Sequence, residues 1–177
     1  MENTRLVPDQ REAPVSREVQ ESADPVKLFE QTAQEPGEYP GGYSGRGIVI
    51  CGGGGRLFTC SYVCIRMLEW LGCDLPIELW HLGPEEMPDE YREVLEPYEV
   101  GIVDAREVEQ DNPVRILNGW ELKPFSIIHS EFKEVLFLDA DNVPVRDPSF
   151  LFDTEEYRRF GAVFWPDFGR LDQTRRI

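Results

Sequence analysis

Two aspartates, Asp139 and Asp141, follow Val135-Leu136-Phe137-Leu138, the most hydrophobic short run of the sequence. Residues two apart in an extended chain point to the same side, so the two carboxylates are expected to converge. Such a pair concentrates negative charge, and its hard oxygen atoms suit Mn²⁺ or Mg²⁺ carrying a phosphate-containing ligand. The sequence therefore predicts a metal site at Asp139 and Asp141. The alternative is a capped turn, because Asn142-Val143-Pro144 is typical of turns.

Two other functions for the Asp-Ala-Asp segment can be weighed from its neighbours. A calcium-binding helix-loop-helix needs an oxygen donor and then a glycine where Val143 and Pro144 stand, so that motif is excluded. The run VLFLDADNV also resembles the first motif of haloacid-dehalogenase phosphatases, in which Asp139 would be the nucleophile and Asp141 the general acid/base. That family needs a downstream lysine, and none follows Asp141. The phosphatase is kept as an alternative.

Lys123 and the glycine run at 52–55 are also of residue types that can bind phosphate. Lys123 begins a predicted helix, where it could point at a diphosphate or lie on the surface as an ordinary solvated lysine. Gly52-Gly53-Gly54-Gly55 could let the backbone approach phosphates or could simply form a flexible turn. No Gly-Lys-Ser/Thr follows it, so it is not a P-loop.

The cysteines and histidines favour structural roles. Cys51, Cys60, Cys64 and Cys73 lack the paired spacing of a zinc ribbon, and Cys60 and Cys64 lie four apart on a predicted helix, which indicates core packing. Neither His81 nor His129 has a neighbouring His or Cys ligand, so both are expected to be structural, with satisfied hydrogen bonds.

The elements that position these residues alternate between strands and helices. The patterns predict strands at 48–51, 77–82, 100–103, 135–138 and 161–165, and helices at 58–71, 89–95 and 121–132. This alternation predicts an α/β fold with a mostly parallel sheet covered by helices on both faces. Ligands of such folds bind at the carboxyl ends of the strands, where Cys51 and Asp139 stand.

Composition sets limits on the class of protein. The chain has 177 residues, 41% of them hydrophobic, and a net charge of −16, which argues against nucleic-acid binding. It contains no apolar run long enough to span a membrane and no apolar signal segment, which predicts a cytoplasmic protein with reduced thiols. Residues 1–44 are predicted to form an acidic, mostly disordered tail, and residues 45–177 the folded domain.

Several blocks in order resemble the fungal-type α-mannosyltransferase family, which includes the α-1,2 and α-1,3 enzymes of the fungal Golgi. The blocks are GRGIVICGGG (45–54), YVCIRMLEWLGC (62–73), LPIELWHLGPEEM (75–87), RILNGWELKPFSIIHSEFKEVLFLDADNVPVRDPSFLFD (115–153) and GAVFWPDFGRL (161–171). The resemblance implies a GT-A nucleotide-sugar transferase fold, GDP-mannose as donor, a glycan acceptor and a divalent metal, Mn²⁺ or Mg²⁺. It further implies transfer with retention of configuration and no dedicated nucleophile.

The resemblance also implies roles for individual residues. Asp139 and Asp141 match the family's Asp-x-Asp metal pair, with Asp139 also near the ribose. Lys123 matches a lysine that approaches the donor sugar or phosphates, and Cys51 and Gly52 would face the nucleotide base. The family's second half is expected after the Asp-x-Asp region, whereas this chain stops shortly after Trp165-Pro166-Asp167, so the sequence predicts an N-terminal half. The alternative function is a non-catalytic nucleotide-sugar-binding fragment. Self-association through an exposed sheet edge is a separate expectation.

Overall fold

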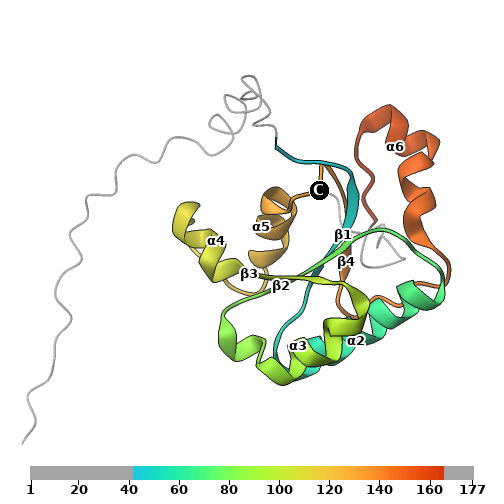
Figure 1. The fold of residues 1–177 in the computed structure, drawn as a ribbon. Coiled ribbons are helices and arrows are strands. Elements are labelled where there is room, and N and C mark those ends of the chain that lie inside the picture. The colour runs from blue at the N-terminus through green and yellow to red at the C-terminus, as the bar shows by residue number, and fades with distance from the viewer. Residues whose placement is uncertain (1–41, 166–177) are drawn as a thin grey trace, which may run out of the picture. The chain divides into compact units, whose positions relative to one another are not determined.

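A computed structural model describes residues 42–165 of the chain as an α/β domain built on one parallel sheet. Its strands are β1 (Arg46–Cys51), β2 (Ile77–His81), β3 (Gly101–Asp104) and β4 (Glu134–Asp139), in the spatial order β3-β2-β1-β4. All three neighbouring pairs are parallel, and Cys51 lies opposite both Trp80 and Asp139. The predicted α/β fold with a parallel sheet is confirmed, and it is consistent with a GT-A-like domain (Figure 1).

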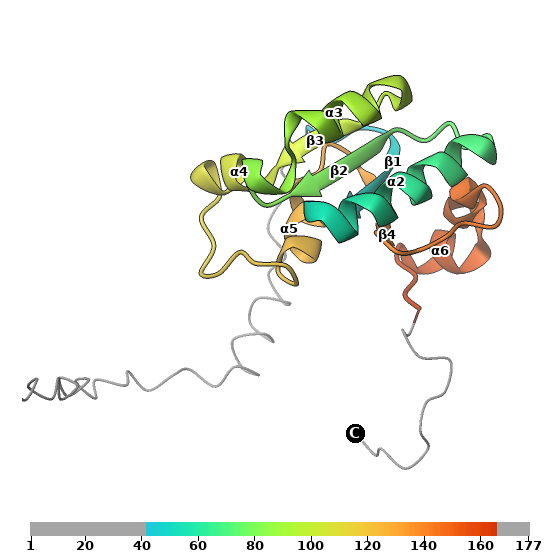
Figure 2. The same cartoon turned by 90° about the horizontal axis from the view of Figure 1, so that it is seen from below.

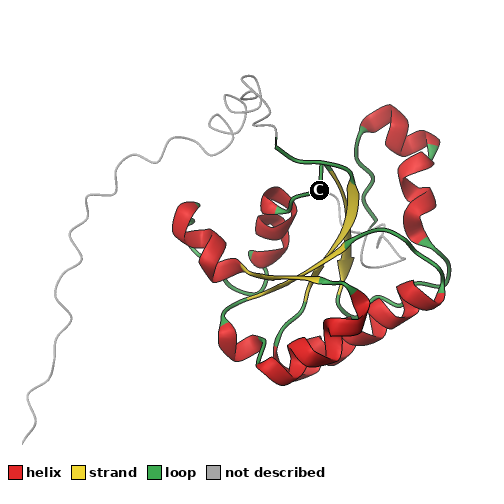
Figure 3. Ribbon diagram, in the orientation of Figure 1, coloured by secondary structure: helices red, strands yellow, loops and turns green. Residues whose placement is uncertain are grey.

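Helices connect the strands and cover the sheet on both faces (Figures 1 to 3). The α-helices are α2 (Gly54–Trp70), α3 (Asp89–Leu95), α4 (Ala105–Asp111), α5 (Leu122–His129) and α6 (Glu155–Phe160). Three short 3₁₀ helices complete the described elements: η1 (Pro84–Glu86), η2 (Glu96–Tyr98) and η3 (Pro148–Asp153). No helix in the described part of the chain has both the length and the apolar character needed to cross a lipid bilayer.

Alternation along the strands separates two hydrophobic cores. Ile48 and Ile50 of β1 pack with α2, α3 and η3, in a cluster that includes Leu68 and Leu79. Val49, between them in sequence, faces the other way and packs with Trp80, Ala105, Leu117, Leu122 and Phe125, under α4 and α5. Successive strand residues point to opposite faces of the sheet. Because helices cover both faces, β1 is apolar at consecutive positions.

The helix that leads into β4 is shorter than the sequence predicts. The pattern indicated a helix over 121–132, whereas α5 ends at His129. Phe132 instead packs its ring on β1 at Gly47, where any Cβ would lie 2.3 Å from the ring atoms. Phe132 has the apolar spacing of a longer helix, but it is apolar because it packs on the sheet.

The strand predicted at 161–165 is wrong. Gly161 takes a left-handed φ of 72° and ends α6, and the residues after it have no regular structure. Phe164 is 89% exposed and Trp165 is 63% exposed, so this apolar run lacks the neighbouring strand that would bury it among the described residues.

Some predictions lie outside the described residues. These include nearly all of the acidic tail, since only 42–44 of residues 1–44 are described, and the segment from Pro166 to the end of the chain. Strand β4 forms one edge of the described sheet, and self-association through that edge stays a prediction.

Candidate functional site

The carboxyl ends of β1 and β4 bring Cys51 and Asp139 side by side in the sheet. Helix α5 lies over this edge on the Val49 face and places Lys123 in its first turn. The Lys123 ammonium forms an ion pair with the Asp139 carboxylate, and the two side chains are 30% and 35% exposed. The structure thus brings together three residues from three different elements, β1, α5 and β4.

Aromatic rings flank the Lys123 ammonium. Its Nζ lies 4.8 Å from the centre of the Trp120 ring and 5.9 Å from that of Phe137. Both distances allow a cation–π attraction, which helps to hold the ammonium beside Asp139. Trp120 is 78% exposed, so its indole is available to a ligand that approaches the ion pair.

Ser126 links Cys51 to α5, and sequence reasoning missed it. Its Oγ donates to the Lys123 carbonyl at 2.9 Å, so the Cys51 thiol, 3.2 Å away, donates to Oγ. Burial raises the pKa of Cys51 to about 11, against opposing effects of Ser126 and Lys123. The thiol is therefore protonated at neutral pH and fastens α5 to β1. The available signal was spacing, since Ser126 lies three residues after Lys123 in the predicted helix and therefore on the same helical face.

Gly52 contributes close packing. It is buried, and its N–H donates to the Trp80 carbonyl at 2.9 Å. A Cβ at Gly52 would lie 1.9 Å from Ser61 Oγ on α2, so the turn from β1 into α2 requires glycine there. Gly54, by contrast, has a left-handed φ of 67° with no atom within 4 Å of a Cβ position. Among the residues of the run, Gly54 rather than Gly52 borders open space.

Asp141 lies outside the strand. The Asn142 N–H donates to the Asp139 carbonyl at 2.9 Å, so the chain turns directly after Asp139 and leaves Asp141 exposed. The expectation that both carboxylates point to one side of an extended strand is therefore wrong, because β4 ends at the first of them. Within residues 42–165, no group of three or more His, Cys, Asp or Glu side chains is placed to hold a metal ion.

The two histidines, His81 and His129, differ in their burial and in the groups that they contact. His81 is fully buried at the end of β2, and its Nδ1 donates to the Gly83 carbonyl at 2.9 Å. Its Nε2 has no hydrogen-bond partner within residues 42–165, so the expectation of a satisfied histidine is not met at that atom among the described residues. His129 packs against Phe125 in α5, and burial lowers its pKa.

All four cysteines are free, and Cys64 is fully buried, as its predicted core position requires.

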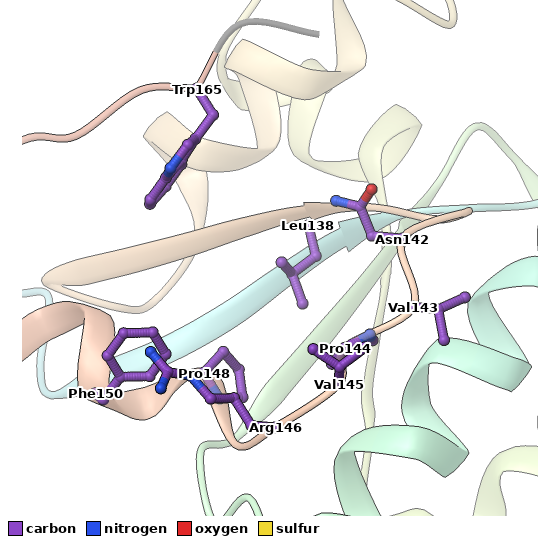
Figure 4. Close-up of a pocket in the computed structure, with 9 residues that line it drawn as sticks. All are labelled: Leu138, Asn142, Val143, Pro144, Val145, Arg146, Pro148, Phe150 and Trp165. Atoms are coloured by element: carbon purple, nitrogen blue, oxygen red, sulfur yellow. The ribbon is translucent and has the colours of Figure 1, made fainter. Parts of the chain in front are cut away.

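A groove of about 560 Å³ lies beside the Asp-Ala-Asp turn but on the other face of β4. It is lined by Leu138, which contacts the Ile48 core, and by residues of the following loop and Trp165 (Figure 4). Asp139 follows Leu138 and points to the opposite face, toward α5. Trp165 lies at this groove, which is separate from the Lys123–Asp139 pair.

Comparison with known proteins identifies similar sequences. The family described as "Mannosyltransferase putative" matches residues 45–176. The α-1,2-mannosyltransferase MNN2 of Candida albicans is 30% identical over 145 residues, which are 80% of this chain and 24% of that protein. MNN2 of Saccharomyces cerevisiae is 30% identical over 133 residues, covering 73% of this chain and 22% of that protein. The chain spans about a quarter of the length of these relatives.

Proposed function

This chain belongs to the putative mannosyltransferase family, and from that premise we propose that it forms the donor-binding part of a metal-dependent α-mannosyltransferase. The proposed reaction transfers mannose from GDP-mannose to a glycan acceptor with retention of configuration, on a GT-A fold. The observation that carries the proposal is the Lys123–Asp139 pair at the carboxyl ends of β1 and β4. Ligands of parallel α/β sheets bind at this edge.

The donor set fits Mn²⁺ or Mg²⁺ bound together with a diphosphate. Asp139 and Asp141 supply two carboxylates, and such ions are commonly held by one or two carboxylates with phosphate oxygens completing the shell. When bound, the ion would stabilise the negative charge that develops on the departing diphosphate. Asp139, on the strand end, has a fixed position, and exposed Asp141 in the turn has the freedom to close on the ion.

Lys123 is proposed to bind the donor phosphates. Its ammonium stands beside Asp139, and α5 is held in place by Leu122 and Phe125 in the core and by the Cys51–Ser126 hydrogen bond. A positioned ammonium stabilises a leaving diphosphate as its charge grows. The amino end of α2 starts at the same edge, without a side-chain cap or an acidic residue in its first turn, which also favours an anion.

Cys51 supports a mechanism without a protein nucleophile at this position. Its thiol has a pKa of about 11 because it is buried, and thiolate is the nucleophilic form. Attack by the acceptor hydroxyl on the same face as the leaving group accounts for retention without a covalent intermediate. Cys51 and Gly52 then support the nucleotide site from beneath, through their packing against α5 and α2.

Binding measurements on variants test the site. Calorimetric titration of GDP with saturating Mn²⁺ should show at least about tenfold weaker binding to Asp141→Asn and Asp139→Asn than to the parent, since each removes a charged metal ligand. Asp74→Asn is the matched control, because Asp74 is exposed before β2, at the other end of the sheet. Parental GDP binding by Asp141→Asn would overturn the assignment.

A non-catalytic nucleotide-sugar-binding module is the second candidate, because the chain matches about a quarter of its relatives. Both candidates bind GDP with Mn²⁺, but the transferase alone releases GDP from GDP-mannose. Chromatography of GDP-mannose incubated with the chain, Mn²⁺ and mannose oligosaccharides separates them. The haloacid-dehalogenase alternative receives no support from the family match.

A further inference from the structure

We propose that Lys123 acts as an internal counter-ion for Asp139, which keeps the metal position closed until a nucleoside diphosphate arrives. Metal and diphosphate would then bind as a pair, and either one alone would bind weakly. The inference rests on the proposed function, because it takes Asp139 as a metal ligand and Lys123 as a phosphate ligand.

The ion pair is built into the fold. Lys123 and Asp139 are in direct contact, and about two thirds of each side chain is shielded, with exposures of 30% and 35%. The ammonium also lies near the faces of Trp120, at 4.8 Å, and Phe137, at 5.9 Å. Partial desolvation strengthens both kinds of attraction relative to a fully exposed pair.

Only the end of the lysine side chain is free to move. The α5 backbone around Lys123 is fixed, because Leu122 is 4% exposed in the core and the Lys123 carbonyl accepts from Ser126 Oγ at 2.9 Å. The four-carbon stem can carry the ammonium from Asp139 to a neighbouring phosphate while the helix stays in place. Asp139 lacks this freedom, since it ends a strand paired with Cys51.

The Lys123 ammonium is expected to leave Asp139 for a metal ion only when a diphosphate is also present. A divalent cation that binds Asp139 alone must break the ion pair and leave the ammonium close to a second positive charge. The described residues offer no third carboxylate, histidine or cysteine that would compensate for this repulsion. A diphosphate does compensate, because it accepts the displaced ammonium and at the same time supplies oxygen ligands to the metal.

Titration of Mn²⁺ alone tests the inference without any turnover. We expect Lys123→Met to bind Mn²⁺ about tenfold more tightly than the parent, because the metal no longer competes with an ammonium. With Mn²⁺ saturating, the same variant should bind GDP about tenfold more weakly, because a charged hydrogen bond to phosphate is lost. Lys123→Arg keeps the charge and should bind Mn²⁺ like the parent.

Lys133→Met is the matched control, since Lys133 is exposed just before β4, at the opposite end of that strand. It removes the same charge from the chain and should leave both affinities within about twofold of the parent. Unchanged or weaker Mn²⁺ binding by Lys123→Met, or equal tightening in Lys133→Met, would overturn the counter-ion role. A parent chain that fails to bind GDP with Mn²⁺ would instead contradict the proposed function.

Discussion

Gly52→Ala tests how the turn from β1 into α2 is packed. An alanine Cβ would lie 1.9 Å from Ser61 Oγ, 3.2 Å from Ser61 Cβ and 3.3 Å from the Leu57 carbonyl oxygen. Ser61 is fully buried and donates to that same carbonyl at 2.9 Å, so it has little room to move. Overpacking of this kind costs about 1–3 kcal/mol, from which reduced backbone entropy of the unfolded chain subtracts about 0.4–1 kcal/mol. We expect a net loss of about 1–2 kcal/mol in the free energy of unfolding.

Urea denaturation followed by circular dichroism measures this loss, and a double-mutant cycle locates it. In a Ser61→Ala background the 1.9 Å contact is absent, so Gly52→Ala should cost at least about 1 kcal/mol less than in the parent. Gly55→Ala is the matched control in the same run, because its nearest atom, Tyr91 Oη, is 3.7 Å away and the residue is helical. It should stabilise the chain by about 0.5–1 kcal/mol.

Two results would refute the packing argument. One is a Gly52→Ala chain as stable as the parent, and the other is a loss that stays the same in the Ser61→Ala background. Because Gly52 is buried, folded Gly52→Ala should bind GDP like the parent, whereas a direct contact between Gly52 and the nucleotide would weaken binding without any loss of stability.

Three further predictions concern buried or partly buried polar groups. Cys51, with a pKa near 11, should react with iodoacetamide at pH 8 about a hundredfold more slowly than a thiol of ordinary pKa, as measured by peptide mass spectrometry; equal rates would contradict its burial. Because burial lowers the pKa of His129, the unfolded chain binds its proton first, and the free energy of unfolding should fall as pH drops below about 6.5; His129→Gln should lose this part of the pH dependence in urea titrations. Trp80→Phe removes the 2.8 Å bond from Nε1–H to Glu78 Oε2 and should cost about 1–3 kcal/mol in urea denaturation, since Glu78 is 6% exposed; parental stability would contradict the bond.

The sequence predicted the first four strands to within one or two residues and α3 at its observed bounds. These elements have local causes, since an apolar β-branched run or a helical spacing is visible without the rest of the fold. Helix α6 was missed although its signals are local: Thr154 caps it by accepting from the Tyr157 N–H, and Gly161 ends it. The strand at 161–165 failed for a non-local reason, because an apolar run becomes a strand only beside a partner.

The sequence identified the residues of the candidate site, but it did not predict how their side chains are arranged. Lys123 and Asp139 were each singled out, but their ion pair depends on β4 lying next to β1, which no spacing in the chain specifies. The extended geometry expected from Asp139 to Asp141 is absent, because β4 ends and the chain turns at Asp139. The metal, the donor, the cytoplasmic location and the tail boundary at residue 44 stay predictions.

Calorimetric titration of GDP and UDP into the 177-residue chain, with and without Mn²⁺, tests the central claim most directly. We expect GDP to bind when Mn²⁺ is present and to bind at least about tenfold more weakly without the metal. UDP should bind more weakly than GDP under both conditions. Absence of GDP binding in the presence of Mn²⁺ by a chain with a cooperative unfolding transition would contradict a donor site at Lys123, Asp139 and Asp141.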